Sequence, residues 1–232
     1  MRTDRKNNEL RKIKFTKDFT KNAPGSVLVE FGDTKVITTA SVDFSKPKWM
    51  EKDSVQGWVT AEYSLLPSST NTRCKRERTS VSGRTQEIQR LIGRSLRACV
   101  DMKKIPDMTI IVDADVIQAD GGTRTASICG GFLALQDAIE KLMKDGKLKE
   151  NPIIEPIAAI SVGIVKEEVR LDLNYEEDSS AQVDANVVLT KSGKIIEFQT
   201  TAEGEPLTKD QMLQIFEVAQ QGISEIINKY SI

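Results

Sequence analysis

The feature that most constrains the fold is a stretch in which a strand pattern passes through two glycines into a long helix pattern. Residues 109–117 are β-branched and partly alternating, which favours a strand. Apolar residues then recur at spacings of three and four from Ile128 to Leu142, which predicts one buried face of a helix. Gly121 and Gly122 lie between the two patterns, and their missing side chains let the backbone approach a ligand closely.

This turn has the composition of an anion-binding site. The first amides of a helix have no partner within the helix and carry positive partial charge, so they stabilise a nearby anion. Arg124 adds a planar guanidinium that suits phosphate oxygens, while Thr123 and Thr125 offer hydroxyls for a helix cap or for the same oxygens. The alternative is an ordinary strand-to-helix turn capped by threonine, because the stretch matches neither a Walker loop nor a dinucleotide fingerprint.

Strand patterns followed by helix patterns occur twice along the chain. This order predicts an α+β fold of two similar halves, approximately residues 1–145 and 156–232. The first twenty residues are basic and polar, and we expect them to form an ordered but lightly anchored arm. The expected strands are residues 26–31, 34–42, 57–63, 109–117, 158–165, 168–174, 183–190 and 195–200, and the expected helices are 85–102, the segment that holds Ile128–Leu142, and a final helix that begins with a capping box at Thr208–Gln211.

The composition excludes several kinds of site. The 232 residues include no histidine, which removes Ser-His-Asp and Cys-His triads and histidine zinc sites. Cys74, Cys99 and Cys129 have no metal-ligand spacing, and we expect reduced thiols. No apolar run approaches the roughly 20 residues that span a bilayer, and the first residues lack an apolar signal core. We therefore expect a cytoplasmic protein without a membrane partner, in which catalysis uses carboxylates, arginines, lysines, hydroxyls or a hard metal ion.

Charge is distributed unevenly, although the net charge is only −1. Residues 73–97 hold eight basic and two acidic side chains, and residues 167–184 hold seven acidic and one basic. Such blocks suit a phosphate-rich substrate handled beside a metal ion, or they are two solvated faces. Arg90, Arg94 and Arg97 share the polar side of the helix expected at 85–102, as a solvated surface or as a docking face for acid or phosphate.

Asp178 and Asp184 lie six residues apart across a polar bend between two expected strands. At this spacing two carboxylates could face one site. Together they could hold a magnesium or manganese ion, or one could act as a general acid while its neighbour stays ionised. The alternative is a solvated loop before a strand.

Six segments carry a more specific pattern: Gly25–Val36, Gly57–Tyr63, Arg84–Arg94, Gln118–Ser127, Glu177–Ser179 with Asp184–Val187, and Thr201–Glu205. Together they resemble the bacterial phosphate-dependent exoribonucleases of the RNase PH family, from near Arg2 to near Ile227. The resemblance implies the RNase PH fold as a single domain over residues 1–232, with two βαβα-type halves of ribosomal-S5-domain-2-like topology.

The resemblance also implies a function. Members of this family remove nucleotides one at a time from RNA 3′ ends, notably those of tRNA precursors, with inorganic phosphate as co-substrate and nucleoside diphosphates as products. The assembly implied is a homo-oligomeric ring, a hexamer built as a trimer of dimers. The residues implied are Arg84, Gly122, Thr123 and Arg124 for phosphate, Asp178 and Asp184 with Arg84 for catalysis, the same two aspartates for Mg²⁺ or Mn²⁺, and Arg73 and Arg76 for RNA.

Two positions depart from the family pattern. Ser68 stands where an arginine commonly follows Leu-Pro, and Ser82 replaces a second glycine in the short loop before the first phosphate arginine. Two other functions stay open: a catalytic subunit of an exosome-like ring, which would need a partner subunit, and an inactive ring protein that only binds RNA. Loss of Arg124, Asp178 or Asp184 would indicate the inactive protein, and all three are present.

Overall fold

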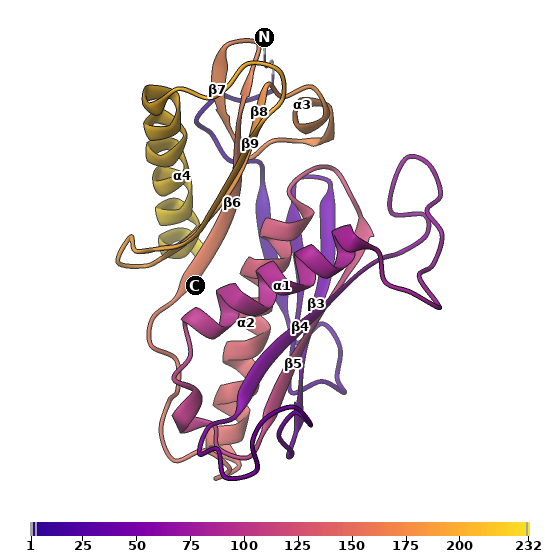
Figure 1. Ribbon diagram of the computed structural model, residues 1–232, viewed down its shortest axis with the longest axis vertical. Helices are drawn as coiled ribbons and strands as arrows, with labels where there is room; N and C mark the ends of the chain where they lie inside the picture. Colours follow the sequence, from indigo (N-terminus) through magenta and orange to yellow (C-terminus); the bar gives the residue numbers. More distant parts are fainter. Residues whose placement is uncertain (1, 3, 231) are drawn as a thin grey trace.

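The structure is a computed structural model that describes residues 2, 4–230 and 232 (Figure 1). No helix in these ranges combines the length and the apolar character that a bilayer span requires. The elements in chain order are β1 (Ile13–Lys17), β2 (Gly25–Phe31), β3 (Thr34–Asp43), β4 (Trp58–Leu65), α1 (Gly83–Ala98), the 3-10 turn η1 (Met102–Lys104), β5 (Thr109–Gln118), α2 (Thr123–Lys144), β6 (Ile157–Val165), β7 (Glu168–Leu171), α3 (Tyr175–Ser179), β8 (Val183–Thr190), β9 (Ile195–Ala202) and α4 (Lys209–Tyr230).

Each half contains one sheet, which confirms the expected α+β class. The first sheet has the order β1-β2-β3-β5-β4, in which β4 and β5 pair in parallel and are joined by the crossover helix α1. The second sheet has the order β7-β6-β8-β9 and is antiparallel at every described pairing. The hairpin between β2 and β3 turns at Gly32, whose φ of 58° lies in the left-handed region that glycine adopts readily.

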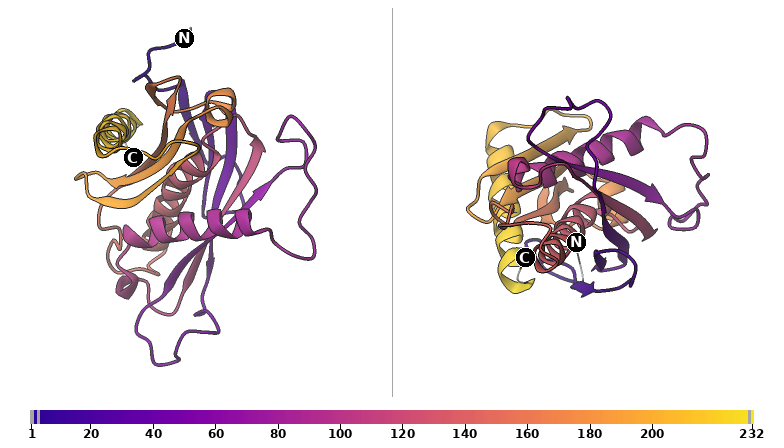
Figure 2. Two further views of the ribbon diagram at one scale, coloured as in Figure 1. Left: turned by 45° about the horizontal axis from the view of Figure 1, so that its top comes forward. Right: turned by 90° about the horizontal axis from the view of Figure 1, so that it is seen from below.

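The elements form four layers: the first sheet, the helix pair α1 and α2, the second sheet, and α4 (Figures 1 and 2). Helix α2 packs on β2, β3 and β5 on one side and on β6 on the other. Its residues 125–135 are therefore all buried, whereas the sequence predicted a helix with one apolar face. Gly130 shows how close the packing is, because an added Cβ would lie 2.1 Å from Cγ2 of Val29. One continuous hydrophobic core results.

The structure corrects the predictions made from the sequence at four places. The amino-terminal arm is anchored, because β1 pairs with β2 and buries Ile13. The strand expected over residues 168–174 ends at Leu171, since Asp172 adopts a left-handed φ of 55° that a strand cannot accommodate. The next residues form the short helix α3, which the sequence did not predict. Helix α1 ends at Ala98 rather than near residue 102.

Candidate active site

The candidate site is a cleft formed where the first turns of α1 and α2 meet α3 and β8. Two adjoining hollows, of about 190 and 330 Å³, share Arg124, Asp178, Asp184 and Asn186 as lining residues. The structure thus brings together every residue expected to bind phosphate or to supply a catalytic carboxylate, from both halves of the chain. The residues concerned are Arg84, Gly122, Thr123, Arg124, Asp178 and Asp184.

The glycine turn leaves the start of α2 open. Gly121 and Gly122 have φ values of 74° and 64°, and Gly122 is the N-cap residue, which has no side chain to cap the helix. Thr123 shares a hydrogen bond of 2.9 Å with the hydroxyl of Tyr63, and the Thr125 hydroxyl donates to the carbonyl of Gly122. Neither threonine caps the amides of the first turn, so the structure contradicts the alternative of a threonine-capped turn and leaves these amides available to an anion.

Two arginines approach the turn from different helices. Arg84 lies in the first turn of α1 and is exposed at the edge of the cleft. The side chain of Arg124 is 16% exposed, and its polar contacts with the described residues are long, 3.4 Å to Oε1 of Gln199 and 3.8 Å to Oε1 of Glu87. Ser82, which replaces the family glycine, is the N-cap of α1 and accepts a hydrogen bond from the amide of Thr85. Both guanidinium groups can therefore turn toward an anion in the cleft.

The two aspartates reach the cleft from α3 and β8. Burial raises the pKa of Asp178, although Arg124 and Arg84 oppose the change. Burial and the nearby charge of Asp178 raise the pKa of Asp184 to about 6, against the opposing charge of Arg124. Oδ2 of Asp184 accepts a hydrogen bond of 3.4 Å from Asn186, while Oδ1 is buried and has no donor in the described part of the chain. Both carboxylates are half-buried in the cleft. The structure therefore does not support the alternative in which they lie on a solvated loop before a strand.

The same carboxylates have the chemistry of a magnesium or manganese site. The buried acceptor Oδ1 of Asp184 lacks a partner, and a cation or water satisfies such an atom. Both protein donors are oxygens, and magnesium is commonly held by one or two carboxylates completed by water and substrate phosphates. Within the described ranges no three histidine, cysteine, aspartate or glutamate side chains gather as a metal site. The residues therefore fit an ion shared with a phosphorylated substrate rather than a closed protein cage.

Arg73 and Arg76 lie apart from this cleft. Both are exposed on the segment 66–82, which leaves the end of β4 and projects from the molecule (Figure 1). Its base is attached to the site, because the amide of Ala119 donates to the carbonyl of Ser69 at 2.7 Å. The described residues that line the cleft include neither Arg73 nor Arg76. Their position suits contacts with a long ligand outside the cleft.

The arginines on α1 do not form one docking face. Arg97 stacks on Trp58 at 4.5 Å from the ring centroid and donates to the carbonyl of Val59. Arg94 pairs with Glu197 at 2.9 Å, and Arg90 is exposed. The stacked Arg97 stabilises the packing of α1 on β4, so only part of this charge cluster faces solvent.

Several residues of the site were missed from the sequence. Asn186 follows Asp184 by two residues on β8, and the two-residue period of a strand was a signal for a shared face. Tyr63 is buried, which raises its pKa, and its hydroxyl holds Thr123. The acidic block is also less solvated than expected, because arginines of the amino-terminal arm pair with Asp172 and Glu177. No local pattern indicates these long-range pairs.

Comparisons with known proteins find related domains over most of the chain. Residues 9–139 match domain 1 of the 3′ exoribonuclease family, and residues 155–222 match its domain 2. Among solved structures, a chain of the Archaeoglobus fulgidus exosome with RNA bound to the active site has a TM-score of 0.83 and 21% identity, covering 97% of this chain and 91% of that one.

Two further structures share the fold. Rrp46 from rice (Oryza sativa) has a TM-score of 0.75 and 21% identity over 98% of this chain and 97% of its own. An archaeal exosome core chain has a TM-score of 0.79 and 20% identity over 98% of this chain and 90% of its own. The matched domains span both halves and the cleft between them, and the chain belongs to the 3′ exoribonuclease family that includes RNase PH.

Proposed function

We propose that this protein is a phosphorolytic 3′-to-5′ exoribonuclease that trims the 3′ ends of tRNA precursors and releases nucleoside diphosphates. One observation carries the proposal: the cleft gathers two arginines, an open helix N-terminus and two carboxylates. The cationic groups suit inorganic phosphate, while the carboxylates lie where a terminal nucleotide and a metal ion would meet it. The presence of Arg124, Asp178 and Asp184 in one cleft argues against a protein that only binds RNA.

The reaction needs no activating base, since inorganic phosphate is already a nucleophile. An oxygen of phosphate forms a bond to the terminal phosphorus of the RNA. The bond from that phosphorus to the 3′ oxygen of the preceding nucleotide breaks, which leaves a nucleoside 5′-diphosphate and an RNA shortened by one residue. Arg84 and Arg124 hold the nucleophile in line with the scissile bond and shield its charge, and such orientation supplies much of the rate.

The leaving 3′ oxygen requires a proton or a neutralising charge. In this proposal Asp178 and Asp184 hold a magnesium or manganese ion, which would stabilise the negative charge that develops there. The alternative is that Asp184, with a pKa of about 6, donates the proton directly while Asp178 stays ionised. A magnesium titration and a pH profile of Asp178→Asn and Asp184→Asn distinguish the two, because loss of an ion ligand changes the magnesium requirement and loss of a proton donor changes the pH profile.

We further propose that Arg73 and Arg76 contact the RNA backbone and that the protein works as a ring of identical subunits, a hexamer of three dimers. The likeness to a chain of an exosome with RNA bound to its active site supports RNA as the ligand. The same likeness favours a second candidate, a catalytic subunit of an exosome-like ring. The purified chain decides between them, because a homo-oligomer should be active alone and an exosome-like subunit should need a partner.

The first prediction tests phosphorolysis. Purified protein is incubated with an RNA that bears a 3′ extension, with and without phosphate, and the mononucleotide released is identified. We expect nucleoside diphosphates only when phosphate is present. Release of monophosphates in phosphate-free buffer would contradict the proposal.

Four variants in the same assay separate the two arginine sets. Arg84→Lys and Arg124→Lys keep the positive charge but lose the planar guanidinium that can donate two hydrogen bonds to one phosphate. The phosphate concentration needed for half-maximal rate should therefore rise severely. Arg73→Ala and Arg76→Ala should weaken RNA binding and flatten its salt dependence, with the phosphate requirement unchanged. If either alanine variant shifts the phosphate titration as far as Arg84→Lys does, the division of roles is wrong.

A further inference from the structure

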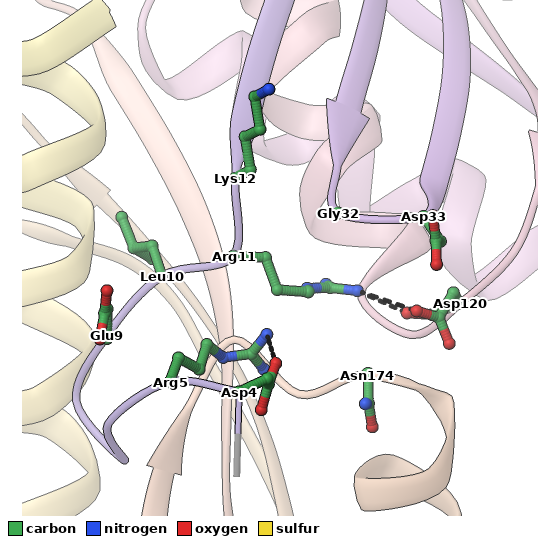
Figure 3. A pocket seen from close by; sticks show the side chains of 10 residues that line it. All are labelled: Asp4, Arg5, Glu9, Leu10, Arg11, Lys12, Gly32, Asp33, Asp120 and Asn174. Atoms are coloured by element: carbon green, nitrogen blue, oxygen red, sulfur yellow. Dashed lines mark hydrogen bonds and ion pairs between the residues drawn. The ribbon is translucent and has the colours of Figure 1, made fainter. Parts of the chain in front are cut away.

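The first part of the amino-terminal arm, residues 2 and 4–11, crosses the junction between the two halves and carries Arg11 to the back of the glycine turn. Arg11 is buried and lines a hollow of about 370 Å³ with Gly32, Asp120 and Asn174 (Figure 3). The guanidinium extends from the arm toward Asp120, as Figure 3 shows. The function proposed above gives no task to a residue on this side of the turn.

Arg11 contacts the backbone of the turn and a carboxylate of the second half at the same time. Its Nη1 donates to the carbonyl of Asp120, and its Nη2 donates to the carbonyl of Gly121 at 3.4 Å. Nη2 also pairs with Oδ1 of Asp172 at 2.7 Å, and the Arg11 amide donates to Oδ2 of the same carboxylate. Asp172 is fully buried, so removing either partner would leave an uncompensated charge.

Thr34 holds the same turn from the first sheet. Its hydroxyl donates to the carbonyl of Gly121 at 2.6 Å and accepts from the amide of Asp120 at 2.9 Å. Arg11 and Thr34 thus bind the carbonyls that precede the amides of Gly121 and Gly122. In a trans peptide the N–H points opposite to the carbonyl, so both amides point away from these donors. Within the described chain, no backbone or side-chain acceptor bonds either amide.

We propose that Arg11 is a positioning residue for the phosphate nucleophile, which by holding the carbonyls of Asp120 and Gly121 aims the amides of Gly121 and Gly122 into the cleft. The inference rests on the proposed function. Both glycines line the cleft beside Arg84 and Arg124, where two aligned amides add donors for one phosphate. The pair with Asp172 also ties the turn to the segment that leads into α3.

The test is a comparison of phosphate and RNA kinetics in three variants. Arg11→Lys keeps the charge but cannot reach two carbonyls and a carboxylate with one planar group, so the KM for phosphate should rise roughly tenfold or more. The KM for RNA and the kcat at saturating phosphate should stay near those of the wild type. Thr34→Val removes the second donor without touching the ion pair and should raise the KM for phosphate in the same direction.

Lys12→Gln is the matched control. Lys12 is exposed on the same arm and lines the same hollow, and its side chain makes no hydrogen bond to the turn in the described structure. This variant loses one positive charge beside Arg11, and its KM for phosphate should equal that of the wild type. If its KM for phosphate rises as much as that of Arg11→Lys, the positive charge of the arm matters rather than the hydrogen bonds of Arg11 to the turn. That result would overturn the inference.

The remaining outcomes are also decisive. If Thr34→Val and Arg11→Lys unfold cooperatively and both keep the wild-type KM for phosphate, the inference is wrong. An equal loss of kcat and of affinity for RNA would show a general structural role and would overturn it too. Calorimetric titration with inorganic phosphate separates this failure from failure of the proposed function. A wild type that binds phosphate but releases no nucleoside diphosphate refutes the function, while the affinities of the variants still test Arg11.

Discussion

At the scale of single residues, the site contains two aspartates whose burial opposes ionisation and raises their pKa values. The folded pKa of Asp184, about 6, lies above the roughly 3.9 of an unfolded aspartate. The folded protein therefore binds this proton more tightly, and stability falls as the pH rises from about 4 to 6. Burial of this carboxylate therefore lowers the stability of the fold at neutral pH.

In metal-free buffer at pH 7, Asp184→Asn should raise the free energy of unfolding by roughly 1–3 kcal/mol, because the amide removes the buried charge and keeps an acceptor for Asn186. The gain should vanish below about pH 4, where the wild-type carboxyl is protonated in both states. Urea unfolding across this pH range measures it. Asp33→Asn, the same change at an exposed position, is the control and should have no effect. A neutral or destabilising Asp184→Asn at pH 7 would contradict the prediction.

At the scale of elements, the short helix α3 depends on the arm rather than on its own length. Glu177 forms a capping box with Asn174, and both of its oxygens lie 2.7 Å from Arg2. Arg5 and Arg170 donate to the same carboxylate. Burial alone would raise the pKa of Glu177, but the hydrogen bond and charge of Arg2, the amide of Asn174 and the charge of Arg5 lower it to about 2.

The stability from this cluster should depend on pH in the opposite sense to that of Asp184. Because the folded pKa of Glu177 lies below the unfolded value, its contribution is complete above about pH 4.3 and is lost as the pH falls toward 2. Glu177→Gln should therefore lower the free energy of unfolding by roughly 3 kcal/mol at pH 7, with a smaller difference near pH 3. Denaturant unfolding at both pH values is the measurement.

Glu168→Gln provides the comparison for this cluster. Glu168 pairs with Arg170 at 2.9 Å, but its side chain is 40% exposed. Solvent screens an exposed ion pair, so this variant should change stability little. If Glu168→Gln is as unstable as Glu177→Gln, the buried carboxylate of Glu177 has no special role in attaching the amino-terminal arm to α3.

At the scale of the whole molecule, the proposed substrate, a transfer RNA precursor, is long compared with one chain of 232 residues. Several copies of the segment 66–82 would raise the effective concentration of its arginines around one RNA. Sedimentation should therefore show a homo-oligomer larger than a dimer. Variants arrested as dimers should lose more activity on tRNA precursors than on short oligonucleotides. Equal losses on both substrates would show instead that assembly shapes the active site.

The sequence by itself determined the local parts of this protein. The paired glycines before α2, the hairpin at Gly32, the capping box at Thr208 and the strand patterns each depend on neighbours within a few residues, so composition and spacing predicted them. The resemblance to RNase PH placed Arg84, Arg124, Asp178 and Asp184, and the structure brings these residues into one cleft. Their catalytic roles stay predictions.

Only the tertiary structure decided what lies behind that cleft. Arg11 and Asp172 are 161 residues apart in the chain, and nothing in either segment indicates that they meet. Helix α2 is buried on two sides because the second sheet folds over it, which a pattern with one apolar face does not show. Helix α3 spans five residues, too few to be stable alone, and the arm arginines hold its carboxylate. Burial and long-range pairing are properties of the assembled fold, and they hold the glycine turn and Asp178 in place.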